Sequence, residues 1–489
     1  MSKKSKSRRV FFFGVMVIIF LAMALRVLMF YENRSLFIDE ASLSSQLIER
    51  PYSGLFDNLK YQYAPPLFAV AVKAMTDIFG ANEYALRLLS LIASLIGIIL
   101  FFQLCRQYLE TKYSLFPLFL FSFGMPMLRY ATEVKQYSSD VTIAIALLLI
   151  CHQWKVEAFN TKRMLLFGLL GALVVWMSMP GVFLLFGIGI YYLYEIYKKK
   201  YWEKTVFVVG SILIWLLSFG IYYFTIIRED IGLKGLEDYH GRFFLPLIPT
   251  SMEEVQQFKN ILLSFFQTAI GATVIAIAFG ILTSIWALFY LNKRNTARVL
   301  LFTLPILAAM LASGLKLYSL IPRLTLFFIP ILILLIGIGT AQLFERSPKL
   351  LKWLLLIPVF IILVNQKGSQ YFYNRFQIEE LRPVLYHVQD NIKTGDGVFL
   401  HYQAENAYVF YSQFYEDSER LNIQDIYIGD WTEPLTEIKL PEYDRLWLIF
   451  SHVGEEEIGR YVDYLKKGYV VREEMEVEGA RVFLLGEER

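Results

Sequence analysis

The sequence predicts a polytopic α-helical membrane protein with a small α/β domain at its C-terminal end. Three observations predict this fold class. The 489 residues are 56% hydrophobic and only 19% charged, whereas about a quarter of the residues in soluble domains are charged. Apolar stretches recur from residue 10 to residue 364. After Asn365 the pattern changes to strands that alternate with amphipathic helices. A disordered chain, a disulfide scaffold and an ordinary soluble enzyme are excluded.

The apolar stretches predict about eleven transmembrane helices within a membrane domain of residues 1–364. Several are shorter than the roughly 20 residues that usually cross a bilayer. The first stretch follows a basic N-terminus and is too long for the apolar part of a signal peptide, so we expect an uncleaved span. The stretches cover residues 10–30, 84–104, 114–128, 138–154, 164–178, 182–197, 205–227, 261–290, 299–313, 324–344 and 353–364.

Charge divides the chain into two parts. From Tyr371 onward 12 Lys and Arg stand against 24 Asp and Glu, and before Tyr371 the counts are 35 and 20, so the net charges are −12 and +15. Every second connection between the predicted spans is short and basic, and the positive-inside rule places these connections and the N-terminus in the cytoplasm. Residues 31–83, residues 228–260 and everything after 364 are then expected outside the plasma (inner) membrane. Because basic loops are a topology signal, no nucleic-acid partner is predicted.

Residues 371–489 are predicted to form an extracytoplasmic α/β domain with a partly parallel sheet. Its length is sufficient for a hydrophobic core of its own. The expected helices are 379–392, 404–415 and 455–467, and the expected strands are 397–402, 423–428 and 445–450.

Neither a metal site nor a cofactor is predicted. The five histidines are scattered, and the outer loops contain no Asp-x-Asp cluster for a divalent ion. Cys105 and Cys151 are too few for a disulfide framework, and we expect them to pack as small apolar side chains.

The first external loop contains the pair Asp39-Glu40 between apolar residues, shortly after the first span. A carboxylate at such a polar–apolar boundary can have a raised pKa and act as a general base. The simpler interpretation, which composition alone favours, is an N-cap: Asp39 would open a helix through residues 40–47. The two roles are compatible.

Several motifs follow one another in a characteristic order. They are LFIDEAS at 36–42, YQYAPPLF at 61–68, NEYALRLLS at 82–90, RYATEVKQY at 129–137 and IPRLTLFFIP at 321–330. In this order and topology the chain resembles the GT-C membrane glycosyltransferases. The likeness is to their bacterial branch related to protein O-mannosyltransferases and aminoarabinose transferases, the RgtA/B/C/D-like group. It covers about residues 10–345 and, more loosely, the C-terminal domain.

The resemblance implies a reaction. Such enzymes take a sugar from a polyprenyl-phosphate donor and transfer it, with inversion, to an acceptor on the outer face of the membrane. The acceptor is an envelope lipid, a glycan or a protein. The base of the family maps onto Asp39, with Glu40 beside it, and we expect both to be catalytic.

The leaving phosphate needs cationic or hydrogen-bonding partners near the membrane surface. The outer cations expected to bind it are Lys60, Arg87, Arg129, Lys135 and Arg323. For each of them the alternative is an interface residue that snorkels. Substrate contacts are expected from Glu133, Tyr137, Tyr63 and His240.

Two positions depart from the family pattern. The aminoarabinose-transferase group has Lys before its Pro-Pro, where this chain has Ala64. The usual Arg of the second external loop is Lys135, which lacks the bidentate geometry of a guanidinium. Both substitutions bear on which sugar donor is used.

Two other functions remain open from the sequence. A transporter or a flippase for lipid-linked sugars would also be polytopic, but such proteins keep charged or broken helices at mid-membrane and show repeats. A polysaccharide polymerase or ligase would share the compartment and the lipid-linked substrates. It differs in taking a preassembled oligosaccharide.

Overall fold

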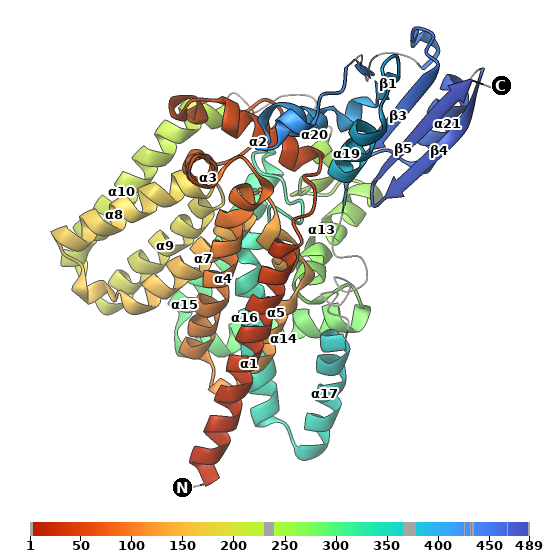
Figure 1. Cartoon of the computed structure of the whole chain (residues 1–489). Coiled ribbons are helices and arrows are strands. Elements are labelled where there is room, and N and C mark those ends of the chain that lie inside the picture. Colours follow the sequence, from red (N-terminus) through yellow and green to blue (C-terminus); the bar gives the residue numbers. More distant parts are fainter. Residues whose placement is uncertain are drawn as a thin grey trace.

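The computed structural model describes residues 3–228, 239–364 and 378–487, apart from residues 425, 431, 433, 434 and 467. A bundle of long helices carries the α/β domain at one end, and the N-terminus lies at the opposite end (Figure 1). The predicted fold class is thus confirmed. The predicted boundary between residues 364 and 371 lies outside the described residues.

The bundle is built from helices that pack in pairs, with α1 on α5, α4 on α7, α8 on α10, α9 on α15 and α14 on α16. Its helices are α1 (Lys3–Tyr31), α4 (Glu83–Tyr108), α5 (Thr111–Phe123), α6 (Met125–Arg129), α7 (Tyr137–Gln153), α8 (Thr161–Met177), α9 (Gly181–Lys199), α10 (Thr205–Tyr222), α13 (Met252–Ile270), α14 (Val274–Arg294), α15 (Thr296–Gly314), α16 (Ile329–Arg346) and α17 (Lys349–Val364).

Each predicted apolar stretch is helical. Among the described residues, six helical segments are long and apolar enough to cross a membrane, and a seventh is counted if α6 and α7 form one span bent by 116°. Two stretches are broken where the sequence predicts one helix. Residues 114–128 break at Gly124, and residues 261–290 break between α13 and α14 after Gly271, whose φ of +94° ends the helix.

Helices α14 and α16 run parallel and touch closely. Gly280 lies against Ile336, and Gly339 lies directly on the carbonyl oxygen of Thr283, where a Cβ atom would come within 1.9 Å. Small residues at such crossings let two backbones approach, which is how membrane helices gain packing energy.

We expect Gly339→Ala to lower the free energy of unfolding by about 1–3 kcal/mol, because the added methyl group must push α14 away. Gly220→Ala in α10 is the matched control, since nothing lies within 4 Å of its Cβ position. Thermal unfolding in detergent measures both variants, and an unchanged melting temperature for Gly339→Ala would contradict the close packing.

Two further helices belong to the first outer loop: α2 (Ile38–Glu49) lies beside α20 (Glu405–Val409) of the C-terminal domain, and α3 (Pro66–Phe79) packs on α4 and α8 of the bundle (Figure 1). Helix α2 matches the predicted helix, whereas α3 is absent from the sequence-based expectations. Pro66 stands at the first position of α3, where a missing N–H costs nothing.

The C-terminal domain contains a five-stranded mixed sheet in the order β2-β1-β3-β5-β4. Strand β1 pairs in parallel with β2 and β3, as predicted, and an antiparallel hairpin of β4 and β5 follows, which the predicted strands do not include. The elements are α19 (Leu381–Asn391), β1 (Gly397–Leu400), α20 (Glu405–Val409), β2 (Ile426–Ile428), β3 (Arg445–Ser451), α21 (Glu455–Leu465), β4 (Tyr469–Val477) and β5 (Ala480–Glu487).

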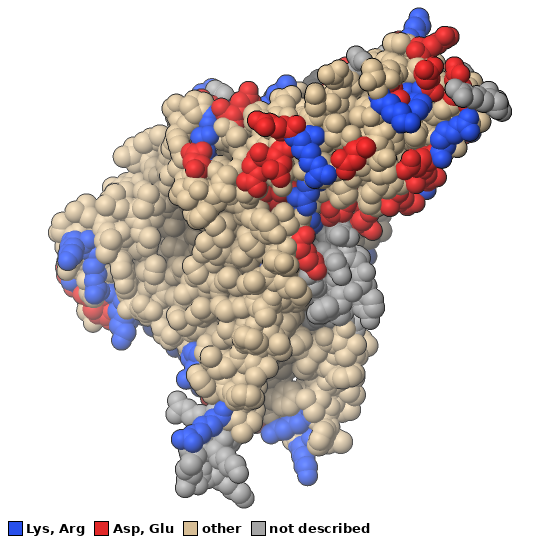
Figure 2. All heavy atoms as spheres, in the orientation of Figure 1, with Lys and Arg blue, Asp and Glu red and all other residues tan. Residues whose placement is uncertain are grey.

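Charges separate along the long axis of the molecule. Figure 2 shows Lys and Arg at the lower ends of the bundle, an almost uncharged middle, and most Asp and Glu around the upper end and the C-terminal domain. An uncharged belt between two charged ends is the surface that a bilayer requires.

Candidate active site

Asp39 is the second residue of helix α2 and faces Arg323. Its carboxylate is 36% exposed, and Oδ2 lies 3.7 Å from Nη1 of Arg323, which is 30% exposed. The N-cap residue is Phe37, which makes no side-chain cap bond. The N-cap interpretation of Asp39 is therefore wrong: Asp39 lies inside the first helical turn, where a negative charge is favourable. Its side chain is free to point toward Arg323.

Glu40 points the opposite way and is completely buried. Its carboxylate accepts hydrogen bonds from Arg87 at 2.7 and 3.0 Å, from Arg34 at 2.9 Å and from the Val134 amide at 2.8 Å. Burial by itself raises the pKa of Glu40, but Arg34 and Arg87 outweigh burial and lower it to about 2. This network joins three segments of chain behind Asp39.

The loop between α6 and α7 lies near both Glu40 and Asp39. Glu133 is buried and accepts a 3.2 Å bond from Arg129, which is 36% exposed. The Lys135 ammonium donates to Gln62 Oε1 at 2.7 Å, and it interacts electrostatically with Asp39 and Arg323. The loop thus brings the Lys135 cation near the Asp39 carboxylate, and Glu133 holds Arg129 next to the loop.

Aromatic side chains surround Arg323. Its guanidinium lies 5.9 Å from the ring centre of Tyr239, and it interacts electrostatically with Tyr137 and Tyr130. His240 bonds Ser319 through Nδ1 at 2.9 Å. Burial and the nearby Arg323 lower the pKa of His240. A neutral imidazole offers a hydrogen bond rather than a charge.

The structure thus brings together most of the predicted site residues and separates four of them, including Glu40, which is buried in the protein. Arg323, Lys135 and Tyr137 interact with Asp39 itself. Glu133 joins this group through Lys135, Arg129 through Glu133, and His240 through Arg323. Arg87 is buried on Glu40 and away from solvent. The Lys60 backbone is bonded to Gln46, and two helical turns separate Gln46 from Asp39, about 10 Å along the axis. The Tyr63 hydroxyl is bonded to that of Tyr222.

Two buried arginines were missed by sequence reasoning. Arg34 bridges Glu40 and the Thr132 carbonyl. Arg26, fully buried in α1, donates to Ser94 and to the Ser122 and Met127 carbonyls on both sides of the α5–α6 break. Both lie near the outer end of the first span, where the positive-inside pattern disfavours cations. Two arginines at the outer end of a span are an exception to that pattern, and this exception could have identified them from the sequence.

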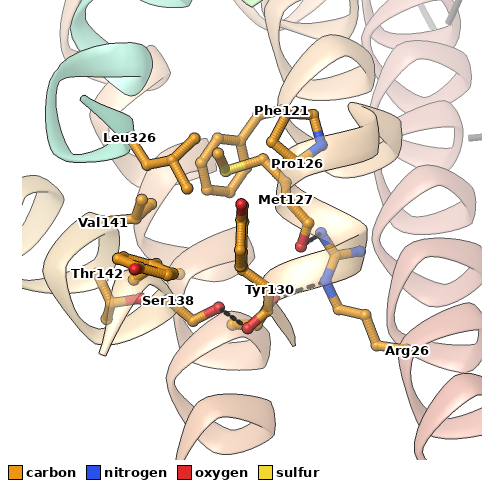
Figure 3. Close-up of a pocket in the computed structure, with 12 residues that line it drawn as sticks. Arg26, Phe121, Pro126, Met127, Tyr130, Ser138, Val141, Thr142 and Leu326 are labelled. Atoms are coloured by element: carbon orange, nitrogen blue, oxygen red, sulfur yellow. Dashed lines mark hydrogen bonds between the residues drawn. The ribbon is translucent and has the colours of Figure 1, made fainter. Parts of the chain in front are cut away.

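Arg26 lines a small cavity with Tyr130, Tyr137 and other bundle residues (Figure 3). The cavity measures about 10 Å³, which is at the lower limit for one water molecule. It cannot hold a substrate, so Arg26 braces the broken helix beneath the site.

A much larger cavity of about 620 Å³ lies beside the site, and Pro322, the residue before Arg323, is in its wall. Cavities that bind small molecules have this size. Its polar wall comes from one face of α13 and from Arg242. The lining residues are Arg242, Phe243, Met252, Glu253, Gln256, Gln257, Asn260, Ile261, Ser264 and Pro322.

Within the described ranges, no group of three or more His, Cys, Asp or Glu side chains is arranged to hold a metal ion.

Comparisons with known proteins concern the fold of the chain. Residues 63–223 match the family model described as dolichyl-phosphate-mannose-protein mannosyltransferase. The solved structure of ArnT from Cupriavidus metallidurans bound to undecaprenyl phosphate is similar, with a TM-score of 0.52 and 11% identity over 99% of this chain and 98% of that one. The oligosaccharyltransferase of Archaeoglobus fulgidus gives a TM-score of 0.45 and 12% identity over 95% and 72%.

No curated protein matches the chain in sequence. The family match over residues 63–223 and the structural likeness along the whole length confirm the predicted resemblance: the chain has the fold of the GT-C membrane glycosyltransferases.

Proposed function

We propose that this protein is an inverting glycosyltransferase that moves a sugar from a polyprenyl-phosphate donor to an acceptor hydroxyl on the outer face of the plasma membrane. The observation that carries the proposal is the accessible Asp39 carboxylate 3.7 Å from Arg323, in a fold shared with a protein that binds undecaprenyl phosphate. A base and a phosphate-binding cation are thus adjacent.

Asp39 is the general base. The acceptor oxygen attacks the anomeric carbon, its proton passes to the Asp39 carboxylate, and the bond from that carbon to the phosphate oxygen breaks. The electron pair leaves with the polyprenyl phosphate. A positioned carboxylate contributes roughly 10²–10⁴-fold to such a step.

Arg323 is the principal partner of the donor phosphate, with Lys135 and Arg129 nearby. Charge that develops on the leaving phosphate is stabilised by cations already held in place. Three tyrosines lie around Arg323: Tyr239, and the pair of Tyr130 and Tyr137, whose ring centres are 4.8 Å apart. Arg87 and Glu40 bond each other, the Lys60 ammonium lies 5.7 Å from the ring centre of Tyr61, and the Tyr63 hydroxyl bonds that of Tyr222. These four residues are given no part in this step.

The adjoining cavity accommodates the hydroxyl-rich part of a substrate. Gln256, Gln257 and Asn260 present amides, which both donate and accept hydrogen bonds as sugar hydroxyls do. Glu133, Tyr137 and His240 are the substrate contacts on the Asp39 side. The end of the molecule that carries Asp39 and the C-terminal domain faces outward, and the basic end faces the cytoplasm.

One reconstitution tests the function. Purified protein in liposomes is given polyprenyl-phosphate monosaccharides, and sugar transfer is followed for the wild type and for Asp39→Asn. Sugar transfer by the wild type that is lost in Asp39→Asn supports the proposal. Movement of the lipid-linked sugar across the bilayer without transfer would indicate a flippase, and transfer of preassembled oligosaccharide alone would indicate a polymerase or ligase.

Arg323 provides a second test of the same site. We expect Arg323→Ala to lower kcat/KM for the donor by about 10²-fold or more, because a phosphate-stabilising group is removed. Arg323→Lys retains the charge but loses the two-pronged geometry, so its loss should be intermediate. Donor titrations measure both variants.

The matched control is Arg420→Ala, which breaks an exposed 3.3 Å pair with Asp390 on the C-terminal domain. Its kcat/KM should equal that of the wild type. Equal losses in Arg323→Ala and Arg420→Ala would contradict a specific role for Arg323.

A further inference from the structure

Helix α2 carries Asp39, and no side chain of the residues next to its first turn caps its N-terminus. The first backbone N–H groups of a helix need an acceptor, and Ser, Thr, Asp or Asn usually supplies one. Here the N-cap residue is Phe37, which provides none. The acceptor for the Ile38 amide is Oε2 of Glu379, at 2.9 Å and 341 residues away in the chain.

The C-terminal domain bonds the segment before Asp39 at two more points. The Ser35 amide donates to Glu380 at 3.1 Å, and the Leu36 amide donates to the Tyr411 hydroxyl at 2.8 Å. Three of the four backbone amides between residues 35 and 38 are therefore bonded by side chains of the C-terminal domain. The position of Asp39 depends on that domain.

Glu379 is itself held by a histidine of the C-terminal domain. Nδ1 of His452 bonds its second oxygen, Oε1, at 2.5 Å. Glu379 is 3% exposed and His452 is 51% exposed. The chain of contacts runs from His452 through Glu379 to the amide directly before Asp39.

The backbone of His452 is in the left-handed region, with φ of +61°. This conformation has a higher free energy for residues other than glycine, and it tends to be retained where the side chain has a function. The hydrogen bond that His452 donates to Glu379 raises the pKa of His452, and the charges of Glu379 and Asp39 act in the same direction against burial. His452 is thus electrostatically connected with Asp39.

We propose that the C-terminal domain is a working part of the active site, in which Glu379 caps helix α2 and His452 fixes Glu379, both as positioning residues for Asp39. This inference rests on the proposed function for its effect on turnover. Its structural part, the cap itself, is independent of that function. A misplacement of about 1 Å at a reacting group can cost about 10²-fold in rate.

The experiment compares Glu379→Ala, Glu379→Gln and His452→Gly in the full chain. Hydrogen exchange of the amides of residues 36–44 reports on the cap, and kcat and KM are measured with a small acceptor. For Glu379→Ala we expect faster exchange in α2, a kcat lowered about 10–100-fold and an unchanged donor KM. Glu379→Gln retains an oxygen for the Ile38 amide, so it should restore part of both losses.

His452→Gly separates function from stability. Glycine adopts the left-handed conformation without strain, which offsets part of the cost of leaving the buried Glu379 carboxylate without this partner, so the melting temperature should fall only slightly while kcat falls. The control Glu473→Gln changes another His–Glu pair of the same domain, 2.8 Å from His387. It should have wild-type exchange and wild-type kcat.

The outcomes distinguish this inference from the proposed function. Wild-type exchange or wild-type kcat in Glu379→Ala overturns the positioning role, even if Asp39→Asn is inactive. Faster exchange in Glu379→Ala with a fully active Asp39→Asn supports the cap but overturns the role of Asp39. A kcat loss confined to large acceptors would also overturn the inference, because that pattern indicates acceptor binding by the domain.

Discussion

Asp39→Asn is expected to lower kcat by about 10²–10⁴-fold. The asparagine has the same shape but cannot accept the acceptor proton at neutral pH. The substitution should leave the fold intact, because Asp39 is partly exposed and its ion pair with Arg323 spans 3.7 Å, and such pairs contribute little to stability. Sugar transfer in reconstituted membranes measures the loss.

Asp57→Asn is the control for this variant, since Asp57 is an exposed carboxylate in the same external loop. It should transfer sugar at the wild-type rate. The two variants should also share one melting temperature, so that a loss of activity in Asp39→Asn is a loss of chemistry. Wild-type turnover in Asp39→Asn would rule out Asp39 as the base.

Glu40→Gln is expected to produce the largest loss of stability, about 3–5 kcal/mol in the free energy of unfolding. The substitution removes the negative charge that two buried guanidinium groups, Arg34 and Arg87, contact at 2.9 and 2.7 Å. A buried cation without a counter-charge is far more costly than a lost surface pair. Thermal and denaturant unfolding in detergent measure the effect.

The pH dependence of stability follows from the same group. The pKa of Glu40 is lowered in the folded protein from 4.5 to about 2, so the unfolded chain binds the proton more tightly. The stabilisation is complete above the unfolded pKa and is lost as the pH falls through the folded one. Wild-type stability should therefore decrease between about pH 4.5 and pH 2, and Glu40→Gln should lack this part of the decrease.

A surface pair gives the matched control. Glu110→Gln removes the partner of Lys112, which lies 3.2 Å away with both side chains exposed. Its melting temperature should be that of the wild type. Glu40→Gln protein that remains folded at low temperature should retain turnover, because Glu40 supports the site without touching the substrate. Equal stability of the two variants would contradict the buried network.

Much of the fold could be predicted because the residues of a short segment determine whether that segment lies in lipid. A membrane helix must satisfy its own backbone, so its apolar stretch identifies it without knowledge of its neighbours. The alternation of strands and helices after residue 396 predicted β1, β2 and β3 for the same local reason. The breaks at Gly124 and Gly271 were not predicted, because each apolar stretch continues beyond its glycine. Both glycines were nevertheless local signals: Pro126 follows Gly124 at the start of α6, and Gly271 adopts a positive φ.

The candidate site divides in the same way. The neighbouring residues Asp39 and Glu40 look equivalent in the sequence, but they point in opposite directions from α2, one to the accessible side and one into the protein. Arg87 and Arg323 likewise have the same chemistry, yet one neutralises Glu40 and the other faces Asp39. Residue type alone cannot distinguish a residue that holds the site in place from one that faces the substrate.

Composition and the ordered motifs were therefore sufficient to predict the membrane environment, the fold class and the loop that carries Asp39. Each of these properties is determined by residues within a short stretch of chain. The surroundings of Asp39 depended on contacts between distant segments. Arg323 follows it by 284 residues, and the Glu379 carboxylate that caps its helix belongs to another domain. Such contacts are decided by how helices and domains pack, which is a property of the whole chain and of no single stretch.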